Sequence, residues 1–285
     1  MRERNGPASG TQAVERAIAI LAALGGARAD AGLSELAAEL GLHKTTAFRL
    51  LGALEREGFV ARNAERQTYR LGPALIRLGA QARRATGLHD AAHAVIDGLA
   101  AETGETATLE VLVGDDVLIL DEVHGRFLVG SSPEVGMRWP AHATSTGKVL
   151  LAAARHDGDG TPRREPPPAG RLARFTANTI TSRARLEREL GEVWRNGFAV
   201  GLEEIEPGFV AVGAPVRNAD GRVVAAISVG GPSARLDGTR IELLSGLVRA
   251  AADRISLRLG APPDSLGAHI SAPSTRSARR RSRAS

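Results

Sequence analysis

Length, composition and the absence of cysteine narrow the class of this protein before any motif is considered. The chain has 285 residues, of which 43% are hydrophobic and 24% charged, the ordinary range for a globular protein of one or two domains. It has no cysteine, which excludes disulfides, thiolate catalysis, iron–sulfur clusters and cysteine-based zinc sites. The apolar stretch 17–27 is too short to span a bilayer, and residues 1–10 lack the layout of a signal peptide. We therefore expect a soluble cytoplasmic protein with no membrane contact.

The surplus positive charge lies at the C-terminal end. Lys and Arg (37) exceed Asp and Glu (32), but five arginines and no acid fall in the last ten residues, so residues 1–275 carry no formal net charge. Only local clustering of cations is therefore informative about partners. Residues 1–10 are expected to be a disordered leader, residues 155–170 a flexible loop rich in Pro, Gly and charge, and residues 261–285 a disordered basic tail.

Three helical patterns follow the leader. Residues 14–24 form the first, with an inward face predicted to carry Val14, Ile18, Leu21 and Leu24. The second starts at residues 33–35, with Ser34 as its N-cap. Gly41 breaks the chain before a third helix that starts near Lys44 and ends at Gly58. Two helices joined by a short glycine-containing turn are typical of a helix-turn-helix.

The third helix presents a polar edge suited to duplex DNA. Lysine and hydroxyl groups at a helix N-terminus suit phosphate contacts, because the backbone N–H groups there already favour an anion. Thr45 and Arg49 are four residues apart and share a face that can reach base edges in the major groove. Phe48 either touches a thymine methyl or packs locally. Residues 59–72 are predicted to be two strands around a basic turn, the wing of a winged helix. The residues predicted to contact DNA are Ser34, His43, Lys44, Thr45, Thr46, Phe48, Arg49, Arg62 and Arg66.

A longer second unit alternates strand and helix patterns. Residues 106–114 and 117–123 are rich in β-formers and flank two aspartates, a hairpin pattern. Further strands are predicted at 127–131, 197–202, 209–216 and 223–231, and helices at 90–102, 145–154, 182–196 and 237–259. Sequential strands with helices at the ends of the segment favour an α+β fold with a mainly antiparallel sheet.

Eight segments in this order resemble one known family. They are VERAIAILAAL (14–24), LSELAAELGLHKTTAFRLLGALEREGFV (33–60), YRLGPALIRLG (69–79), PAHATSTGKVLLA (140–152), RFTANTIT (174–181), WRNGFAVGLEE (194–204), EPGFVAVGAPV (206–216) and DGRVVAAISVGGPSARL (220–236). Together they resemble the isocitrate-lyase-regulator (IclR) family of bacterial transcription factors over residues 11–260.

The resemblance implies a domain order and a function. It implies a winged helix-turn-helix DNA-binding domain (11–72), a connecting helix (73–86) and a GAF- or profilin-like effector domain (87–260). It also implies homodimers or homotetramers on a pseudo-palindromic DNA operator, a ligand-responsive regulator that is more often a repressor, and no enzyme activity or cofactor. Two recognition helices on one operator also agree with the few base pairs that a single helix reads.

The family's effector site maps onto a cavity closed by a loop around residues 139–148. Ser145 and Thr146 are predicted to offer anion-binding donors at a helix start, while Thr144 caps that helix. The mapped positions are Leu128, Ser131, Trp139, Ser145, Thr146, Gly201, Phe209, Ala211, Ser228 and Gly230. Relatives often have Asp and Cys where this chain has Gly201 and Ala211. The loss of these polar groups favours a small organic acid with an aromatic or hydrophobic body.

Three other patterns in the sequence do not indicate a phosphate, catalytic or metal site. Residues 145–149 fail the phosphate-loop pattern, and Glu203-Glu204 is expected to be a salt-bridged rim on a strand. His89 and His93 are four apart on a helix, but the sequence offers no third ligand, so no metal site is predicted. Two alternatives to a DNA-binding regulator stay open: an enzyme acting on the bound acid, and a module that docks protein without sequence-specific DNA binding.

Overall fold

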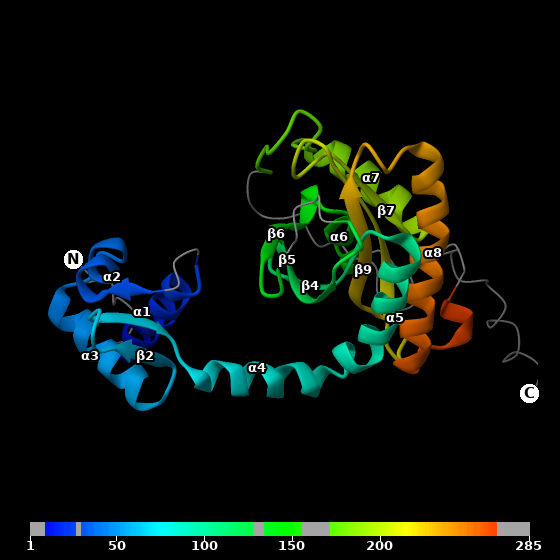
Figure 1. Cartoon of the computed structure of the whole chain (residues 1–285). Coiled ribbons are helices and arrows are strands. Elements are labelled where there is room, and N and C mark those ends of the chain that lie inside the picture. The colour runs from blue at the N-terminus through cyan, green and yellow to red at the C-terminus, as the bar shows by residue number, and fades with distance from the viewer. Residues whose placement is uncertain (1–8, 27–29, 128–133, 156–171, 267–285) are drawn as a thin grey trace, which may run out of the picture. The chain divides into compact units, whose positions relative to one another are not determined.

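The computed structural model describes residues 9–26, 30–127, 134–155 and 172–266 (Figure 1). The chain divides into two compact units, Met1–Ala85 and Thr86–Ser285. Leu128 and Ser131, most of the predicted 155–170 loop, the first eight residues and the tail beyond residue 266 lie outside the described residues. No helix in the described ranges combines the length and apolar character needed to cross a membrane.

The first unit is a winged helix-turn-helix, as predicted. Its elements are α1 (Ser9–Leu24), β1 (Ala31–Gly32), α2 (Leu33–Glu39), α3 (Lys44–Arg56), β2 (Val60–Asn63) and β3 (Thr68–Leu71), followed by α4 (Pro73–Thr86). The three short strands form an antiparallel sheet in the order β1-β3-β2. The hydrophobic core of this unit contains Ile20, Leu36, Leu51 and Tyr69. Because α3 packs into this core through Leu51, its opposite face is exposed to solvent.

Two local predictions in this unit are wrong. Ile20 and Leu24 provide the buried stripe of α1, whereas Val14 and Ile18 are 59% and 60% exposed. The helix carries two apolar stripes, and periodicity alone does not say which one faces the core. Ser34 is not an N-cap, because the extended Gly32 occupies that position and donates its N–H to the Glu35 side chain at 2.9 Å. Ser34 is instead an exposed residue in the first turn of α2.

The second unit has the predicted α+β class. Its elements are α5 (Leu88–Thr103), β4 (Thr106–Val113), β5 (Asp116–Val123), β6 (Arg138–Pro140), η1 (Ala141–Ala143), α6 (Ser145–Ala154), α7 (Arg183–Asn196), β7 (Ala199–Leu202), β8 (Phe209–Arg217), β9 (Val223–Pro232), α8 (Gly238–Arg258) and η2 (Pro263–Ser265). Six antiparallel strands form one sheet in the order β6-β5-β4-β9-β8-β7.

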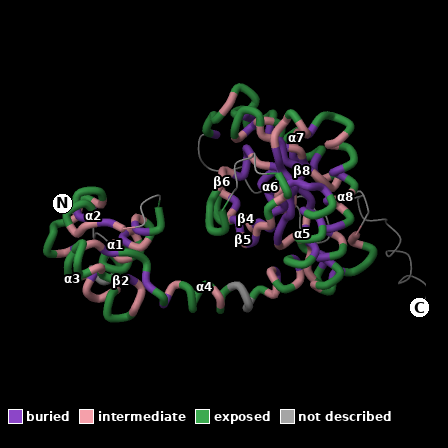
Figure 2. Tube along the Cα trace, in the orientation of Figure 1, coloured by how far each residue is buried: buried purple, intermediate pink, exposed green. Residues whose placement is uncertain are grey.

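Helices cover both faces of this sheet. Apolar residues of α5 and α8 pack on one face, and those of α6 and α7 pack on the other, which gives two hydrophobic cores. Figure 2 shows the buried stretches concentrated in β8 and α6. The central strands are therefore covered on both sides, as their nearly continuous apolar sequences require.

The segment before α6 differs from the prediction. Residues 139–148 are not a loop: they comprise the end of the short strand β6, the 3₁₀ turn η1 and the first turn of α6. Three residues of strand carry too little periodicity to be recognised, and β6 depends on pairing with β5. Of the predicted strand 127–131, Phe127 is not in a strand and the rest lies outside the described residues.

Candidate functional site

The start and outward edge of α3 carry six of the nine residues predicted to contact DNA. His43 is the N-cap of α3 and makes no side-chain capping hydrogen bond. Lys44, Thr45 and Arg49 are exposed, and Thr46 is half-buried. Phe48 is 55% exposed, so it does not pack into its own core and stays available to an outside partner. The helix start thus presents backbone N–H groups, hydroxyls and two cations on one solvent-facing edge.

The wing is a short hairpin whose turn is held by its own side chains. The Asn63 Oδ1 atom accepts hydrogen bonds from the backbone N–H groups of Glu65 and Arg66, both at 3.1 Å. Arg62 donates to the Gln67 side chain and lies over the Tyr69 ring, 5.9 Å from its centroid. Both Arg62 and Arg66 are exposed. Arg62 is therefore anchored along the wing, while Arg66 projects from its tip.

A cavity of about 180 Å³ lies in the second unit. Eight of the mapped effector positions line it, namely Trp139, Ser145, Thr146, Gly201, Phe209, Ala211, Ser228 and Gly230. Ten further lining residues were not among the mapped positions, although Ala143 and Thr144 belong to the segment predicted to close the cavity: Thr106, Thr108, Glu110, Ile119, Met137, Ala143, Thr144, Glu204, Ile205 and Glu206. The structure therefore gathers residues from β4, β5, β6, α6, β7, β8 and β9 around one space.

Small residues keep this space open. A Cβ atom on Gly230 would lie 2.7 Å from the Phe209 ring and 3.2 Å from the Ala211 Cβ. A Cβ atom on Gly201 would lie 3.3 Å from the backbone nitrogen of Ser145. These contacts are tighter than normal packing allows, so larger side chains there would displace the aromatic wall or the start of α6.

Thr144 caps α6 as predicted, since its Oγ1 atom accepts a hydrogen bond from the backbone N–H of Gly147 at 3.1 Å. This leaves Ser145 and Thr146, both buried, on the cavity wall. The start of α6, where the helix dipole is positive, therefore forms part of the cavity wall.

Glu110 is the main polar group that sequence reasoning missed. Its carboxyl oxygens accept hydrogen bonds from Thr108 Oγ1 at 2.7 Å and from Thr146 Oγ1 at 2.6 Å. Burial raises the pKa of Glu110, and the two hydroxyl hydrogen bonds oppose that rise without cancelling it. The neutral form is therefore favoured more than in water, which lessens repulsion of an anionic ligand.

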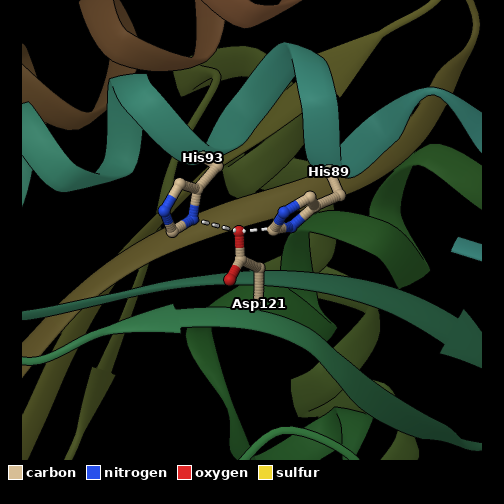
Figure 3. Close-up of side chains that lie close together, drawn as sticks. All are labelled: His89, His93 and Asp121. Carbon is tan, nitrogen blue, oxygen red and sulfur yellow. Dashed lines mark hydrogen bonds and ion pairs between the residues drawn. The ribbon is translucent and has the colours of Figure 1, made fainter. Parts of the chain in front are cut away.

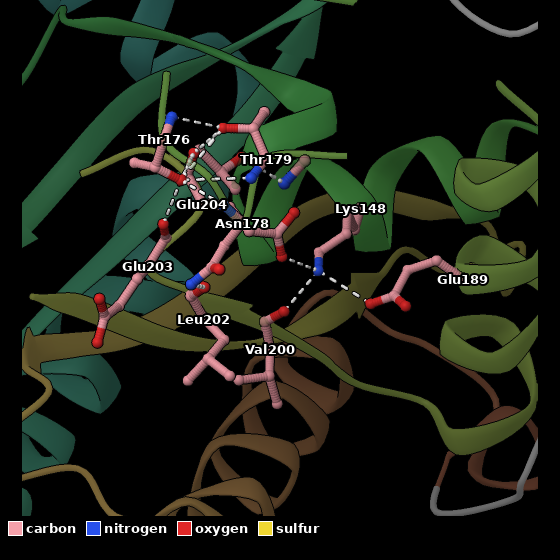
Figure 4. A network of polar contacts seen from close by, with 11 residues as sticks. Lys148, Thr176, Asn178, Thr179, Glu189, Val200, Leu202, Glu203 and Glu204 are labelled. Atoms are coloured by element: carbon pink, nitrogen blue, oxygen red, sulfur yellow. Dashed lines mark hydrogen bonds and ion pairs between the residues drawn. The ribbon is translucent and has the colours of Figure 1, made fainter. Parts of the chain in front are cut away.

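A buried lysine connects the cavity wall to α7 (Figure 4). Lys148 is 1% exposed, and its Nζ donates to Glu189 Oε1 at 3.0 Å, Val200 O at 2.5 Å and Glu204 Oε1 at 2.6 Å. Its charge is therefore used inside the domain and is not offered to a ligand. The predicted salt bridge is confirmed for Glu204, but this residue follows β7 and its carboxylate is buried, so it is not part of an exposed rim on a strand.

One carboxylate oxygen of this network has no hydrogen-bond partner among the described residues. Glu204 lines the cavity, and its Oε2 atom is buried without a hydrogen-bond partner in the part of the chain that the structure describes. A buried carboxylate oxygen without a donor is costly, so Glu204 Oε2 is a polar group that the fold leaves unsatisfied beside the cavity.

Comparison with known sequences and structures gives matches to one group of proteins. The bacterial transcriptional regulator IclR C-terminal family matches residues 80–257, and the IclR helix-turn-helix domain matches residues 13–64. The glycerol operon regulatory protein of Streptomyces griseus is 36% identical, over 88% of this chain and 97% of that protein. The HTH-type transcriptional regulator BhcR of Paracoccus denitrificans is 32% identical over 90% of each chain. The crystal structure of an IclR homologue from Microbacterium hydrocarbonoxydans complexed with 4-hydroxybenzoate has a TM-score of 0.76 and 26% identity, covering 87% of this chain and 98% of that one.

Proposed function

The chain belongs to the IclR family of bacterial transcriptional regulators, and from this we propose a specific function for it. It is a DNA-binding repressor that occupies a pseudo-palindromic operator and responds to a small aromatic carboxylate. The observation that carries the proposal is the pairing of an exposed cation-and-hydroxyl edge on α3 with a separate apolar cavity that has anion donors at one wall.

The DNA half of the proposal rests on α3 and the wing. Thr45 and Arg49 lie on the exposed edge, where an arginine can bond to both acceptors of guanine in the major groove. In the proposed complex, Lys44 at the helix start and Arg66 in the turn of the wing contact phosphates, which the exposure of both side chains supports. A regulator of this kind needs two such helices, because one reads only a few base pairs.

The exposed stripe of α1 supports pairing of two copies. Val14 and Ile18 are 59% and 60% exposed on one helix face, an apolar surface that a second copy of the chain would cover. We therefore propose a homodimer or homotetramer. Replacing Ile18 with Glu is expected to lower the molar mass in light scattering. An unchanged mass would place the dimer contact elsewhere.

The effector half rests on the size and chemistry of the cavity. An apolar cavity of about 150 Å³ is large enough to bind benzene, so about 180 Å³ suits a substituted benzene ring. Ile119, Trp139 and Phe209 provide apolar and aromatic walls. The carboxylate would bind at the start of α6. A ring hydroxyl would donate to Glu204 Oε2 after the atoms that cover this oxygen shift. The 4-hydroxybenzoate complex of the Microbacterium hydrocarbonoxydans homologue has this ligand chemistry.

Regulation then follows from linkage. The effector shifts operator affinity only if it binds one arrangement of the connecting helices more tightly than another. In the proposed mechanism, that arrangement changes the spacing between the two recognition helices of the dimer.

Two experiments test the proposal. Selection from fragmented genomic DNA, followed by mobility shift, should recover a pseudo-palindrome that resists non-specific competitor. If the selection enriches no DNA sequence, the result would favour protein docking over DNA binding.

In a thermal-shift panel, 4-hydroxybenzoate should stabilise the chain more than benzoate or 4-methoxybenzoate, because only 4-hydroxybenzoate can donate a hydrogen bond to Glu204. Stabilisation by glyoxylate or pyruvate alone would refute the aromatic assignment.

A further inference from the structure

Three side chains that play no part in the proposed function converge between α5 and β5 (Figure 3). His89 and His93 are one turn apart on α5, and Asp121 lies on β5. The Oδ2 atom of Asp121 is 2.8 Å from His89 Nδ1 and 2.9 Å from His93 Nδ1. The possible ligand atoms of all three residues lie within 4.8 Å of one another. The third ligand that the sequence did not offer is therefore supplied by the fold.

A β-bulge explains why Asp121 faces the helix. β4 and β5 pair Glu110 with Ile119 but Leu109 with Asp121, so Leu120 is an extra residue on β5. Without the bulge, Ile119 and Asp121 would share one face of the sheet. Ile119 lines the effector cavity, whereas Leu109 belongs to the core beneath α5 and α8. The bulge thus turns Asp121 away from the cavity and toward the two histidines.

The cluster is incompletely satisfied by hydrogen bonds. His93 Nδ1 has good hydrogen-bond geometry to Asp121 Oδ2. His89 Nδ1 is buried and, among the described residues, makes no hydrogen bond of acceptable geometry, although the same oxygen is 2.8 Å away. Both ring nitrogens therefore lie close to one carboxylate oxygen, but only His93 forms a hydrogen bond to it, which leaves the buried His89 nitrogen without a partner among the described residues. A cation between the three groups would satisfy both.

We propose that His89, His93 and Asp121 bind a divalent transition-metal ion, with Zn²⁺ as the preferred occupant. Imidazole nitrogen favours Zn²⁺, Ni²⁺ or Co²⁺ over Mg²⁺ and Ca²⁺, which take oxygen ligands. Metal–ligand bonds of about 2.1 Å in tetrahedral geometry need ligand atoms roughly 3.4 Å apart. The present separations of 2.8 and 2.9 Å reach this with side-chain movements of a few tenths of an ångström.

A metal bound at this site would keep one coordination position for water and would link α5 to β5. The His93 side chain is 53% exposed while that of Asp121 is 7% exposed, so the metal would be held by a buried carboxylate and reached from solvent. Three protein ligands leave the fourth tetrahedral position open to water. Because α5 begins at Leu88, directly after Gly87, the bound metal would fasten the first two turns of α5 to β5.

The test is metal binding by the full chain without an affinity tag, after removal of metal by a chelator. Calorimetric titration with ZnCl₂ should give one strong equivalent per chain, with Co²⁺ absorbance as a second readout and no competition from Mg²⁺. Replacing the exposed His93 with Ala should weaken Zn²⁺ binding at least about 100-fold, more than loss of an outer-shell partner costs. Asp121→Asn should do the same.

His124→Ala is the matched control. The His124 side chain is 64% exposed and pairs with Glu122 at 3.0 Å, but this pair belongs to no three-ligand cluster in the described residues. The control should bind Zn²⁺ like the parent and keep the rise in melting temperature that the metal causes. Absence of stoichiometric binding to the parent, or unchanged binding by the His93→Ala chain, would overturn the proposal.

Discussion

Removal of the buried lysine charge tests how the cavity wall is held. In a Lys148→Met variant, Glu204 keeps a buried carboxylate, 7% exposed at the side chain, without its cation. Breaking a buried ion pair by removing one partner costs about 3–5 kcal/mol. Glu189 is 34% exposed and partly screened by solvent, so most of the loss arises from Glu204. Methionine fills similar space, and little of the cost is a cavity.

Tryptophan fluorescence during urea unfolding measures the loss of stability of the second unit. Trp139 and Trp194 are the two tryptophans of the chain, and both belong to the second unit. We expect Lys148→Met to lower the free energy of unfolding by about 3–5 kcal/mol, and a Lys148→Met/Glu204→Gln double variant to recover about 2 kcal/mol of it.

The control for this prediction is an ion pair nearer the surface. Arg155 donates to Glu187 at 2.7 Å, and the Glu187 side chain is 43% exposed, so Arg155→Ala should cost at most about 1 kcal/mol. The reasoning is refuted if Lys148→Met costs no more than Arg155→Ala, or if the double variant is less stable than the single one.

Three further outcomes are expected. Arg49→Ala should weaken operator binding by about 1–3 kcal/mol, measured by fluorescence anisotropy. Arg56→Ala, at the far end of α3, should weaken it less. Equal effects of the two substitutions would show that Arg49 does not lie on the surface that reads the bases. Because burial raises the pKa of Glu110 above its ordinary value of 4.5, the folded chain holds this proton more tightly and loses stability as pH rises above that value. Glu110→Gln should remove that part of the pH dependence of the melting temperature, and an unchanged profile would contradict it. A Cβ on Gly147 would lie 2.1 Å from the Ala141 carbonyl oxygen, so Gly147→Ala should destabilise the second unit by more than about 1 kcal/mol and weaken effector binding; a neutral effect would argue against this close packing.

Most helices and strands were predictable because residues close in the sequence determine the hydrophobic period on which they depend. Alternating β-formers around Asp115 and Asp116 predicted the β4–β5 hairpin, and the 3.6-residue period predicted α8. The N-cap of α2 was misplaced by two residues, at Ser34 instead of Gly32, because the capping group is the Glu35 side chain, which reaches back to Gly32. The buried stripe of α1 was ambiguous because both of its stripes are apolar.

The polar residues of the second unit were harder to predict because long-range pairing decides their direction. The alternation of Thr106, Thr108 and Glu110 in an apolar strand was the one available sign that a polar group lines the cavity. Asp121 had no such sign. A bulge, visible only through the register of β4 with β5, turns it toward His89 and His93. The family resemblance supplied the mapped cavity positions, and periodicity alone would not have done so.

Coupling between the cavity and the operator is the most direct test of the account. Operator affinity should be measured by fluorescence anisotropy while 4-hydroxybenzoate is added, with calorimetry confirming its occupancy of the cavity. The account predicts an affinity change of about 5- to 150-fold, the usual size of allosteric coupling. An operator affinity that stays constant while the ligand is bound would contradict the claim that this cavity controls DNA binding.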